Sequence, residues 1–304
     1  MPLHAQDYPL KQPVKIVLPV SAGSVSDTFA RIVGNELQSS MGGLFIMDYR
    51  PGAVGTIATE LGAKAAPDGY TLVLASAAQH SVTPWLVRNV PYDPVKDFAH
   101  IIKTTELPFL LVVPPDLPAK TFAEFIAYGK ANPGKLAYGY ATGSSQLGAA
   151  LLNLMAGLNT VAVPYKTPGP ASIDLMAGRI QFMFLDLGTA MPFVTAGQLR
   201  GLAVTSVKRA AFAPNMPSIA ELGYASYDYS SWLGFAAPRG TPREIVQRLN
   251  SEINKAVAKA DIQAKLVALG MDVKPNTVEE QETFVREQLN KWGKVIKEAG
   301  IKPE

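Results

Sequence analysis

The sequence contains no cysteine among its 304 residues, which excludes thiol nucleophiles, thiolate metal sites and disulfide bonds. Long hydrophobic runs are also absent, because the apolar stretches are of strand length, whereas a membrane-spanning helix needs roughly 20 apolar residues. Neither sign of charge dominates, since 28 lysines and arginines stand against 25 aspartates and glutamates, scattered rather than gathered into a basic stripe. Nucleic acid is therefore a poor candidate partner.

Familiar catalytic motifs are missing as well. The segment "GSSQLG" lacks the G-x-S-x-G pattern of a nucleophile elbow, and neither a phosphate loop nor a G-x-G-x-x-G fingerprint occurs. The three histidines, His4, His80 and His100, are far apart and lack metal-ligand spacing. We expect no catalytic residue, no metal and no cofactor. The alternative to a protein without catalytic activity is an enzyme, such as a hydrolase or decarboxylase that uses Ser24 or Ser144 with His80.

What is present indicates an α/β protein. Hydrophobic residues make up 48% of the chain and charged residues 17%, which suits one large or two medium domains with real cores. Short apolar segments alternate with amphipathic helical stretches, a pattern typical of largely parallel sheets. Strands are expected at 14–19, 44–49, 71–75, 109–113, 136–140, 161–164, 180–184 and 199–204. Helices are expected at 26–38, 56–65, 121–131, 144–156, 170–176, 189–196, from 242 to about 258 and from about 278 to 299.

Two segments 120 residues apart share one pattern of strand, small polar turn and helix. They read "KIVLPVSAGSVSDTFARIVGNELQ" from Lys15 and "KLAYGYATGSSQLGAALLNLMAGL" from Lys135. The coinciding pairs are Lys15/Lys135, Gly23/Gly143, Ser24/Ser144 and Ala30/Ala150. Such units converge, so these identities do not prove a repeat. If the chain folds into two lobes and the sheet of each lobe starts in this way, each lobe offers a helix N-terminus at the carboxyl end of a strand. Open α/β sheets bind ligands at such ends.

The first of these turns has the chemistry of an anion site. Backbone N–H groups at the helix start, the positive end of the helix dipole and the hydroxyls of Ser21, Ser24 and Ser26 all suit an anion. Gly23 has no Cβ, which lets the backbone approach a ligand closely. Asp27 stabilises the helix dipole but would repel an anion, so we expect it to hold the turn.

The second turn, Thr142-Gly143-Ser144-Ser145, repeats this chemistry, and neither turn contains lysine or arginine. The implied mode is carboxylate capture by neutral donors and dipoles rather than by ion pairs. Ordinary helix capping is the alternative for each turn, because serine and threonine serve this role in most proteins. Both interpretations stay open at this point.

Six segments, taken in order, resemble the TctC family. Its members, also called Bug proteins, are the periplasmic solute-binding subunits of tripartite tricarboxylate transporters. The segments are "RPGAVGTIATELGAKAAPDGYTLVLAS", "VPYDPVKDFAHI", "KANPGKLAYG", "VPYKTPGPASIDLMAGRIQFMF", "GQLRGLAVTS" and "KWGKVIKEAGIKP". The resemblance implies a two-lobed periplasmic-binding-protein fold, type II-like, that closes on a small carboxylate in the cleft between its lobes and delivers it to the membrane components of the transporter.

The resemblance also implies which residues hold the ligand, because the family grips a carboxylate between the first strand-to-helix turn of one lobe and the equivalent turn of the other. Three departures limit the transfer. The first turn has Ser24 where a glycine is usual, the second turn is about two residues shorter than is common, and Leu185-Asp186 replaces the usual Asp-Asn, which leaves the role of Asp186 open. The expected ligand-binding residues are Ser21, Ala22, Gly23, Ser24, Val25, Ser26, Asp27, Ala78, Gln79, His80, Thr142, Gly143, Ser144, Ser145, Gln146, Lys166, Thr167, Asp186 and Trp232.

The expected organisation follows from the two lobes. Lobe one is assigned residues 6–105 and 228–304, and lobe two residues 106–227, with two crossings that form a hinge. Residues 1–5 are interpreted as the remnant of a removed signal peptide or as a cloning remnant. We expect a periplasmic monomer, and a ligand-sensing subunit that docks on a receptor is a further possibility that the same fold permits.

The ligand itself is expected to be a dicarboxylate. Aromatic residues near the expected cleft suggest an apolar ligand body, while Gln79, His80 and Thr83 would meet a distal carboxylate. Those aromatic residues are Phe29, Tyr138, Tyr140, Trp232 and Phe235, and the alternative, favoured for Phe29, is that they are simply core. With no cation in either turn, a trianion such as citrate would be poorly neutralised. We therefore rank an aromatic dicarboxylate such as terephthalate first and an aliphatic dicarboxylate second.

Overall fold

Strands and helices alternate along the chain, which a computed structural model describes for residues 8–141 and 143–303, with the backbone alone at 143 and 144. The strands are β1 Val14–Leu18, β2 Phe45–Tyr49, β3 Thr71–Ser76, β4 Phe98–Val113, β5 Leu136–Tyr140, β6 Thr160–Pro164, β7 Phe182–Asp186, β8 Arg200–Val204, β9 Ser230–Pro238 and β10 Asp272–Val273. The helices are α1 Val25–Met41, α2 Thr56–Ala63, α3 Thr83–Leu86, α4 Phe122–Ala131, α5 Gly143–Ala156, α6 Pro168–Met176, α7 Leu187–Thr195, α8 Arg243–Ala258, α9 Ala260–Ala268 and α10 Val278–Glu298. The segment interpreted as a signal remnant, residues 1–5, and Thr142 lie outside the described residues.

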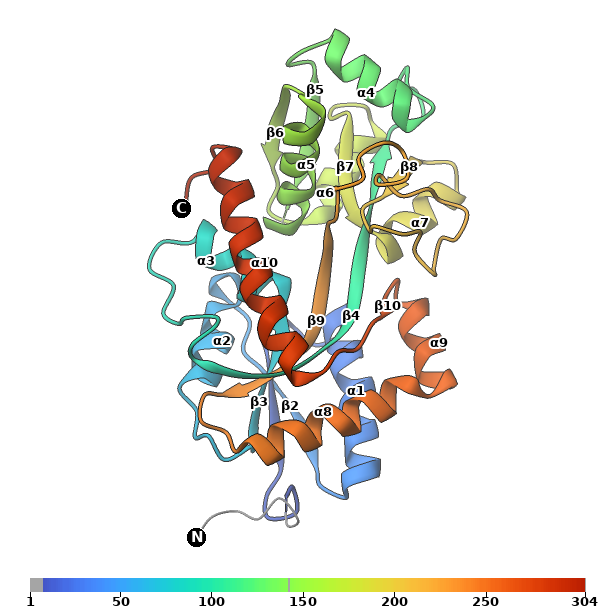
Figure 1. The fold of residues 1–304 in the computed structure, drawn as a ribbon. Coiled ribbons are helices and arrows are strands. Elements are labelled where there is room, and N and C mark those ends of the chain that lie inside the picture. The colour runs from blue at the N-terminus through green and yellow to red at the C-terminus, as the bar shows by residue number, and fades with distance from the viewer. Residues whose placement is uncertain (1–7, 142, 304) are drawn as a thin grey trace.

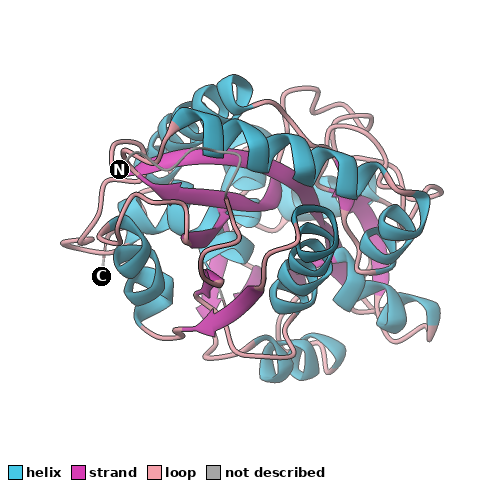
Figure 2. Ribbon diagram, turned by 90° about the horizontal axis from the view of Figure 1, so that it is seen from below, coloured by secondary structure: helices cyan, strands magenta, loops and turns pink. Residues whose placement is uncertain are grey.

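Two lobes are stacked one above the other, and β4 and β9 run between them (Figure 1). The strand order is β2-β1-β3-β9-β4-β7-β5-β6, with β8 and β10 also paired to β4. The first part of β4 pairs with β9, and its last residues pair with β7 and β8. One long strand therefore belongs to the sheets of both lobes, and helices cover both sides of the strands (Figure 2).

Each lobe contains the same parallel triplet of strands. In the lower lobe of Figure 1, β1 pairs in parallel with both β2 and β3. In the upper lobe, β5 pairs in parallel with both β6 and β7. The connecting helices α1 and α5 each follow the central strand of their triplet. The correspondence that the sequence suggests at an offset of 120 residues is thus confirmed as a shared topology.

Separate apolar clusters stabilise the lobes. In the lower lobe, α1 packs its buried residues Phe29, Val33 and Leu37, spaced four apart, against the sheet and α8. The N-cap Ser24 and a left-handed glycine, Gly42 with φ 75°, define the ends of α1. In the upper lobe, α4 and α5 pack against the other part of the sheet.

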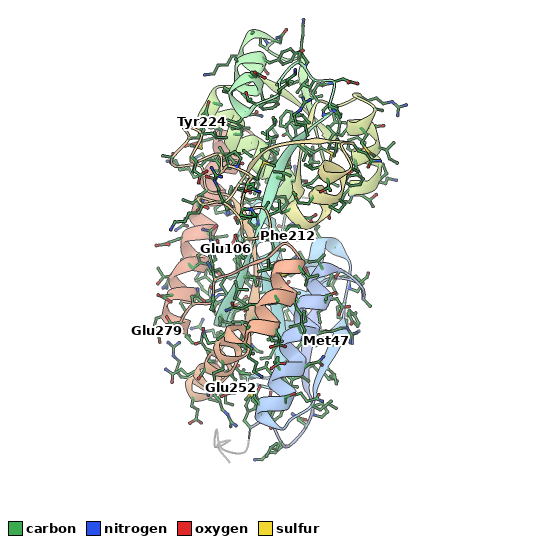
Figure 3. The ribbon with its side chains drawn as sticks, turned by 90° about the vertical axis from the view of Figure 1, so that its right-hand side faces the viewer. Met47, Glu106, Phe212, Tyr224, Glu252 and Glu279 are labelled. Atoms are coloured by element: carbon green, nitrogen blue, oxygen red, sulfur yellow. The ribbon has the colours of Figure 1, made fainter. Side chains whose placement is uncertain are left out.

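The C-terminal helix α10 joins the two lobes on one side. Its N-terminal residue Val278 packs in the lower core, whereas Trp292, Val295 and Ile296 pack in the upper core. Near the waist between the lobes, Figure 3 places Glu106 on β4. Its carboxylate accepts hydrogen bonds from the Lys103 and Lys274 ammonium groups, both at 2.6 Å. The junction is therefore built from paired strands, a helix and a charged network.

Candidate ligand-binding cleft

The sheet register brings the carboxyl ends of the two triplets face to face. Ser76, at the end of β3, pairs with Leu233 of β9, and Leu233 pairs with Thr105 of β4. On the same strand β4, Phe109 pairs with Asp186, the last residue of β7. Because β7 is antiparallel to β4, the end of β7 points toward the lower lobe. The two carboxyl edges are thus separated by four residues of β4, or roughly 13 Å along the strand.

The first turn lies at the lower edge and is organised by Asp27. Its carboxylate accepts hydrogen bonds from the Gly23 N–H at 2.7 Å and from the Tyr49 hydroxyl at 2.7 Å. Burial raises the pKa of Asp27, but these two hydrogen bonds and the Arg31 guanidinium outweigh burial, so the pKa lies below its ordinary value. The predicted role of Asp27 in holding the turn is confirmed. Its charge is also balanced by Arg31 at 3.0 Å, which weakens its repulsion of an anion.

The rest of this turn is open toward solvent. Ser21, Ala22, Gly23 and Val25 are exposed, and Ser24 and Ser26 are half-buried. The Ser24 hydroxyl caps α1 by accepting from the Asp27 N–H at 3.1 Å. Helical geometry leaves the remaining first-turn N–H groups without partners inside the helix. These groups, at the positive end of the α1 dipole, are the donors that the turn offers to an anion.

The second turn lies at the opposite edge, between β5 and α5. Thr142 lies outside the described residues, and Gly143 and Ser144 are described only as the backbone that opens α5. Ser145 is buried, and its hydroxyl accepts from the Ala141 N–H at 3.2 Å. This hydrogen bond means that Ser145 stabilises the turn. The next residue, Gln146, lines a cleft beside it.

A cleft of about 450 Å³, within the range of small-molecule sites, opens between the two lobes. Its lining includes Ala141 and Gln146 beside the second turn but no residue of the first turn at 21–27. Its walls come from the lower lobe, from the upper lobe and from the C-terminal tail. The lining residues are Val54, Leu86 and Val87 below, Tyr140, Ala141, Gln146, Pro164 and Tyr165 above, and Ile301 and Lys302 from the tail. A groove of about 630 Å³ shares Gln146 and the tail with the cleft, but its other lining residues come from β5, α5, β6 and the end of α10 rather than from the lower lobe's turns.

A smaller hollow of about 80 Å³ extends from the cleft beneath the second turn, where Ala141, Ser145 and Asp186 meet. Asp186 caps α7, because its carboxylate accepts from the Thr189 N–H at 2.9 Å. This bond gives Asp186 a structural role, which the sequence leaves open. Since Asp186 also lines the hollow, its charge opposes a carboxylate placed deep beneath the turn.

His80 and Trp232 are not at the cleft, which corrects the expectation that they contact the ligand. His80 is 0% exposed and Trp232 1% exposed, with their ring centroids 6.0 Å apart. The reason is a π-helical turn at Ala78–Val82, which follows β3 and directs the His80 ring into the core against Phe98. Thr83 is buried too, and His80 cannot serve as a base for a hydroxyl at the cleft surface.

Gln79 and Ala78 hold the edge rather than opening onto it. Gln79 is buried; its amide oxygen accepts from the Ser76 hydroxyl, and its amide nitrogen donates to the Val54 carbonyl at 3.1 Å. Ala78 is half-buried at the start of the π-helical turn. Gln79 therefore positions the loop that carries Val54, and neither Gln79 nor Ala78 lines the cleft.

The remaining predicted residues divide between surface and core. Lys166 and Thr167 are exposed where the chain enters α6, with Thr167 at its N-cap position. Of the aromatic residues expected near the cleft, Tyr140 lines it. Phe29, Tyr138 and Phe235 are buried, and Phe29 and Phe235 stack at 5.5 Å, as the core interpretation of Phe29 predicts.

Sequence reasoning missed several cleft residues, chiefly Val54, Leu86, Val87, Tyr165 and Lys302. A signal existed for two of them. Tyr165 directly follows a strand of the upper triplet, and Val54 follows β2 in "RPGAVG", so both lie after carboxyl ends that face the cleft. No such signal marks Lys302, because its position depends on how the tail packs after α10.

Two structural searches complete the description of the site. Within residues 8–141 and 143–303, no group of three or more histidine, aspartate or glutamate side chains is arranged to hold a metal ion. In the same part of the chain, no helix has the length and apolar character needed to cross a membrane.

Comparison with known proteins identifies relatives over nearly the whole chain. The model of the TctC family, described as "Tripartite tricarboxylate transporter family receptor", matches residues 29–301. BugT of Bordetella pertussis is 32% identical over 304 residues, which cover 99% of this chain and 93% of BugT. The Rhodopseudomonas palustris protein Rpa4515, solved with adipate, is 34% identical with a TM-score of 0.84, covering 98% of this chain and 100% of that one. MatC from the same organism, solved with bound malate, is 29% identical with a TM-score of 0.76, covering 94% and 99%.

Proposed function

This chain belongs to the TctC family of receptors for tripartite tricarboxylate transporters, and on that premise we propose that it binds a dicarboxylate with an apolar middle. The ligand occupies the cleft between the lobes and is presented to the membrane components of the transporter from the periplasm. As a family member, the chain is a solute-binding protein rather than an enzyme.

The observation that carries this proposal is the pair of helix N-termini at opposed carboxyl edges. Each N-terminus bears roughly half a positive charge together with N–H groups that have no partner inside the helix. Two such ends suit the two carboxylates of a dianion. Lys302, at the side of the cleft, adds one cation. A citrate trianion would leave one carboxylate without such an end.

The middle of the cleft supports the apolar part of the proposal. Tyr140 and Tyr165 line the upper wall, and Val54, Leu86 and Val87 line the lower wall. These side chains offer dispersion contacts and ring faces but few hydrogen bonds to a ligand body. Terephthalate and adipate share the required chemistry of two carboxylates and an apolar spacer. The solved relatives with adipate and malate support binding of dicarboxylates as a class.

Ligand capture requires the two edges to approach each other, so we include hinge closure in the proposal. We keep the lobes at residues 6–105 with 228–304 and at 106–227, which places both crossings in β4 and beside β9. Because the last turns of α10 pack on the upper core, closure also has to move α10 relative to one of the lobes.

Competition calorimetry with terephthalate, adipate, benzoate and citrate tests the proposed function. We expect terephthalate or adipate to bind most tightly, and benzoate to bind more weakly because it lacks the second carboxylate. The relative affinities of terephthalate and adipate decide whether the body is aromatic or aliphatic. Tightest binding of citrate, or consumption of any of these acids during incubation, would contradict the proposal.

A further inference from the structure

The loop that carries Val54 has an unusual backbone. Four consecutive residues have positive φ: Gly52 at 127°, Ala53 at 44°, Val54 at 53° and Gly55 at 87°. Glycine adopts such values freely, but a β-branched side chain such as valine is crowded there. Of the three non-glycine residues with positive φ in the described chain, two are adjacent in this loop. Residue 54 is therefore held in a conformation that its own side chain opposes.

Hydrogen bonds fix this conformation from several sides. The Gly55 N–H donates to the Gly52 carbonyl at 2.8 Å, and the Thr56 hydroxyl donates to the Ala53 carbonyl at 2.8 Å. The Val54 carbonyl accepts from the buried amide of Gln79 at 3.1 Å. The loop thus holds Val54 at a defined place, because its backbone is tied both to itself and to the end of β3.

The side chain of Val54 contributes little to the fold that imposes this strain. It is 69% exposed, more than any other large hydrophobic side chain in the described part of the chain. It lines the cleft on the lower wall, opposite Tyr140, Pro164 and Tyr165 of the upper wall. Strain that is not offset by packing is a feature of functional sites. The isopropyl group has apolar surface to bury only when the cleft is occupied or closed.

We propose that Val54 is a specificity-determining residue, whose isopropyl group covers the middle of the ligand and discriminates against ligands with hydroxyl groups there. The proposal rests on the proposed function and deepens it. An apolar ligand segment buries against Val54, whereas a hydroxyl in the same place loses water without gaining a hydrogen-bond partner. Because hydrogen bonds fix the backbone at Val54, the isopropyl group keeps its place on the cleft wall when the ligand changes.

The test compares adipate with galactarate, which has the same length and carries four hydroxyls. We expect the wild-type protein to bind adipate at least ten-fold more tightly than galactarate. Val54→Gly is expected to weaken the binding of adipate at least five-fold and to leave the affinity for galactarate unchanged or higher. Its Tm is expected to stay the same or rise, because the backbone strain is relieved. Val54→Thr, nearly isosteric but polar, is expected to shift the preference toward galactarate.

Val161→Gly is the matched control, since Val161 is also an exposed valine, on β6, and does not line the cleft. It is expected to leave both affinities unchanged. If the ratio of the adipate affinity to the galactarate affinity is the same in wild type, Val54→Gly and Val54→Thr, the role of Val54 is overturned and the proposed function still stands. Failure of the wild-type protein to bind terephthalate, adipate or any other dicarboxylate would overturn the proposed function itself.

Discussion

Acidification is expected to destabilise this protein through a buried pair of histidines. His80 and His100 lie 5.7 Å apart, both packed against Phe98, and both are at most 2% exposed. Burial, together with the neighbouring His100, lowers the pKa of His80 to about 3, and the Ser76 backbone opposes this shift only in part. Burial likewise lowers the pKa of His100 to about 4, only partly opposed by the Pro94 carbonyl.

The sign of the effect follows from these lowered values. In the unfolded chain each ring binds a proton below its ordinary pKa of 6.5, whereas in the folded protein each ring stays neutral until about pH 4 or below. The folded state is therefore at full stability above pH 6.5 and loses stability as the pH falls below it. Protonation of each ring in the unfolded chain lowers the free energy of unfolding by RT ln(1 + 10^(6.5 − pH)). This loss grows from about 0.1 kcal/mol at pH 7.5 to about 2 kcal/mol at pH 5.

Urea unfolding at pH 7.5, 6.5, 5.5 and 5.0 measures this effect directly. The two rings together predict a loss of about 4 kcal/mol between pH 7.5 and 5, a large part of the 5 to 15 kcal/mol typical of a folded protein. His80→Leu, which removes one titrating ring from an apolar environment, is expected to halve the pH dependence. A free energy of unfolding at pH 5 within about 1 kcal/mol of its value at pH 7.5 would refute the reasoning.

The other predictions concern the first turn and closure. Ser24→Ala is expected to destabilise the protein by about 1 kcal/mol through loss of the α1 cap, and Ser24→Gly by only a few tenths, as thermal melts would show. Asp27→Asn is expected to lower the free energy of unfolding, measured in urea, by about 1 to 3 kcal/mol. Asp261→Asn, in an exposed ion pair, should change it by less than about 0.5 kcal/mol. Equal effects of the two substitutions would contradict the role of Asp27. Small-angle scattering should show a smaller radius of gyration with saturating adipate, and an unchanged radius would argue against closure.

The sequence predicts the elements that are marked by a short apolar run or by a helical apolar period. The central strands β1 and β5, their polar turns and helices α1 and α5 follow from apolar periodicity and turn chemistry, which are local properties. The first part of β4 and all of β9 escaped prediction. In "FAHIIKTTELP" and "SSWLGFAAP", burial on both faces removes the alternation that marks a half-exposed strand.

The site shows the same division between local and long-range information. The two turns are visible in the sequence, and the register of β4 explains why they face each other, which no local pattern reveals. His80 was misplaced because the π-helical turn after β3 reverses the direction of its side chain. Val54 escaped notice because its importance depends on a backbone conformation that valine seldom adopts.

The central claim, that one ligand bridges the two turns, is tested most directly by a crystal structure of the protein with adipate bound. We predict that one carboxylate accepts hydrogen bonds from N–H groups of residues 24–26 and the other from N–H groups of residues 143–146. The chain between the two carboxylates should contact Val54 and Tyr140. Adipate held by one lobe alone, or found in the outer groove beside the C-terminal tail, would contradict the account.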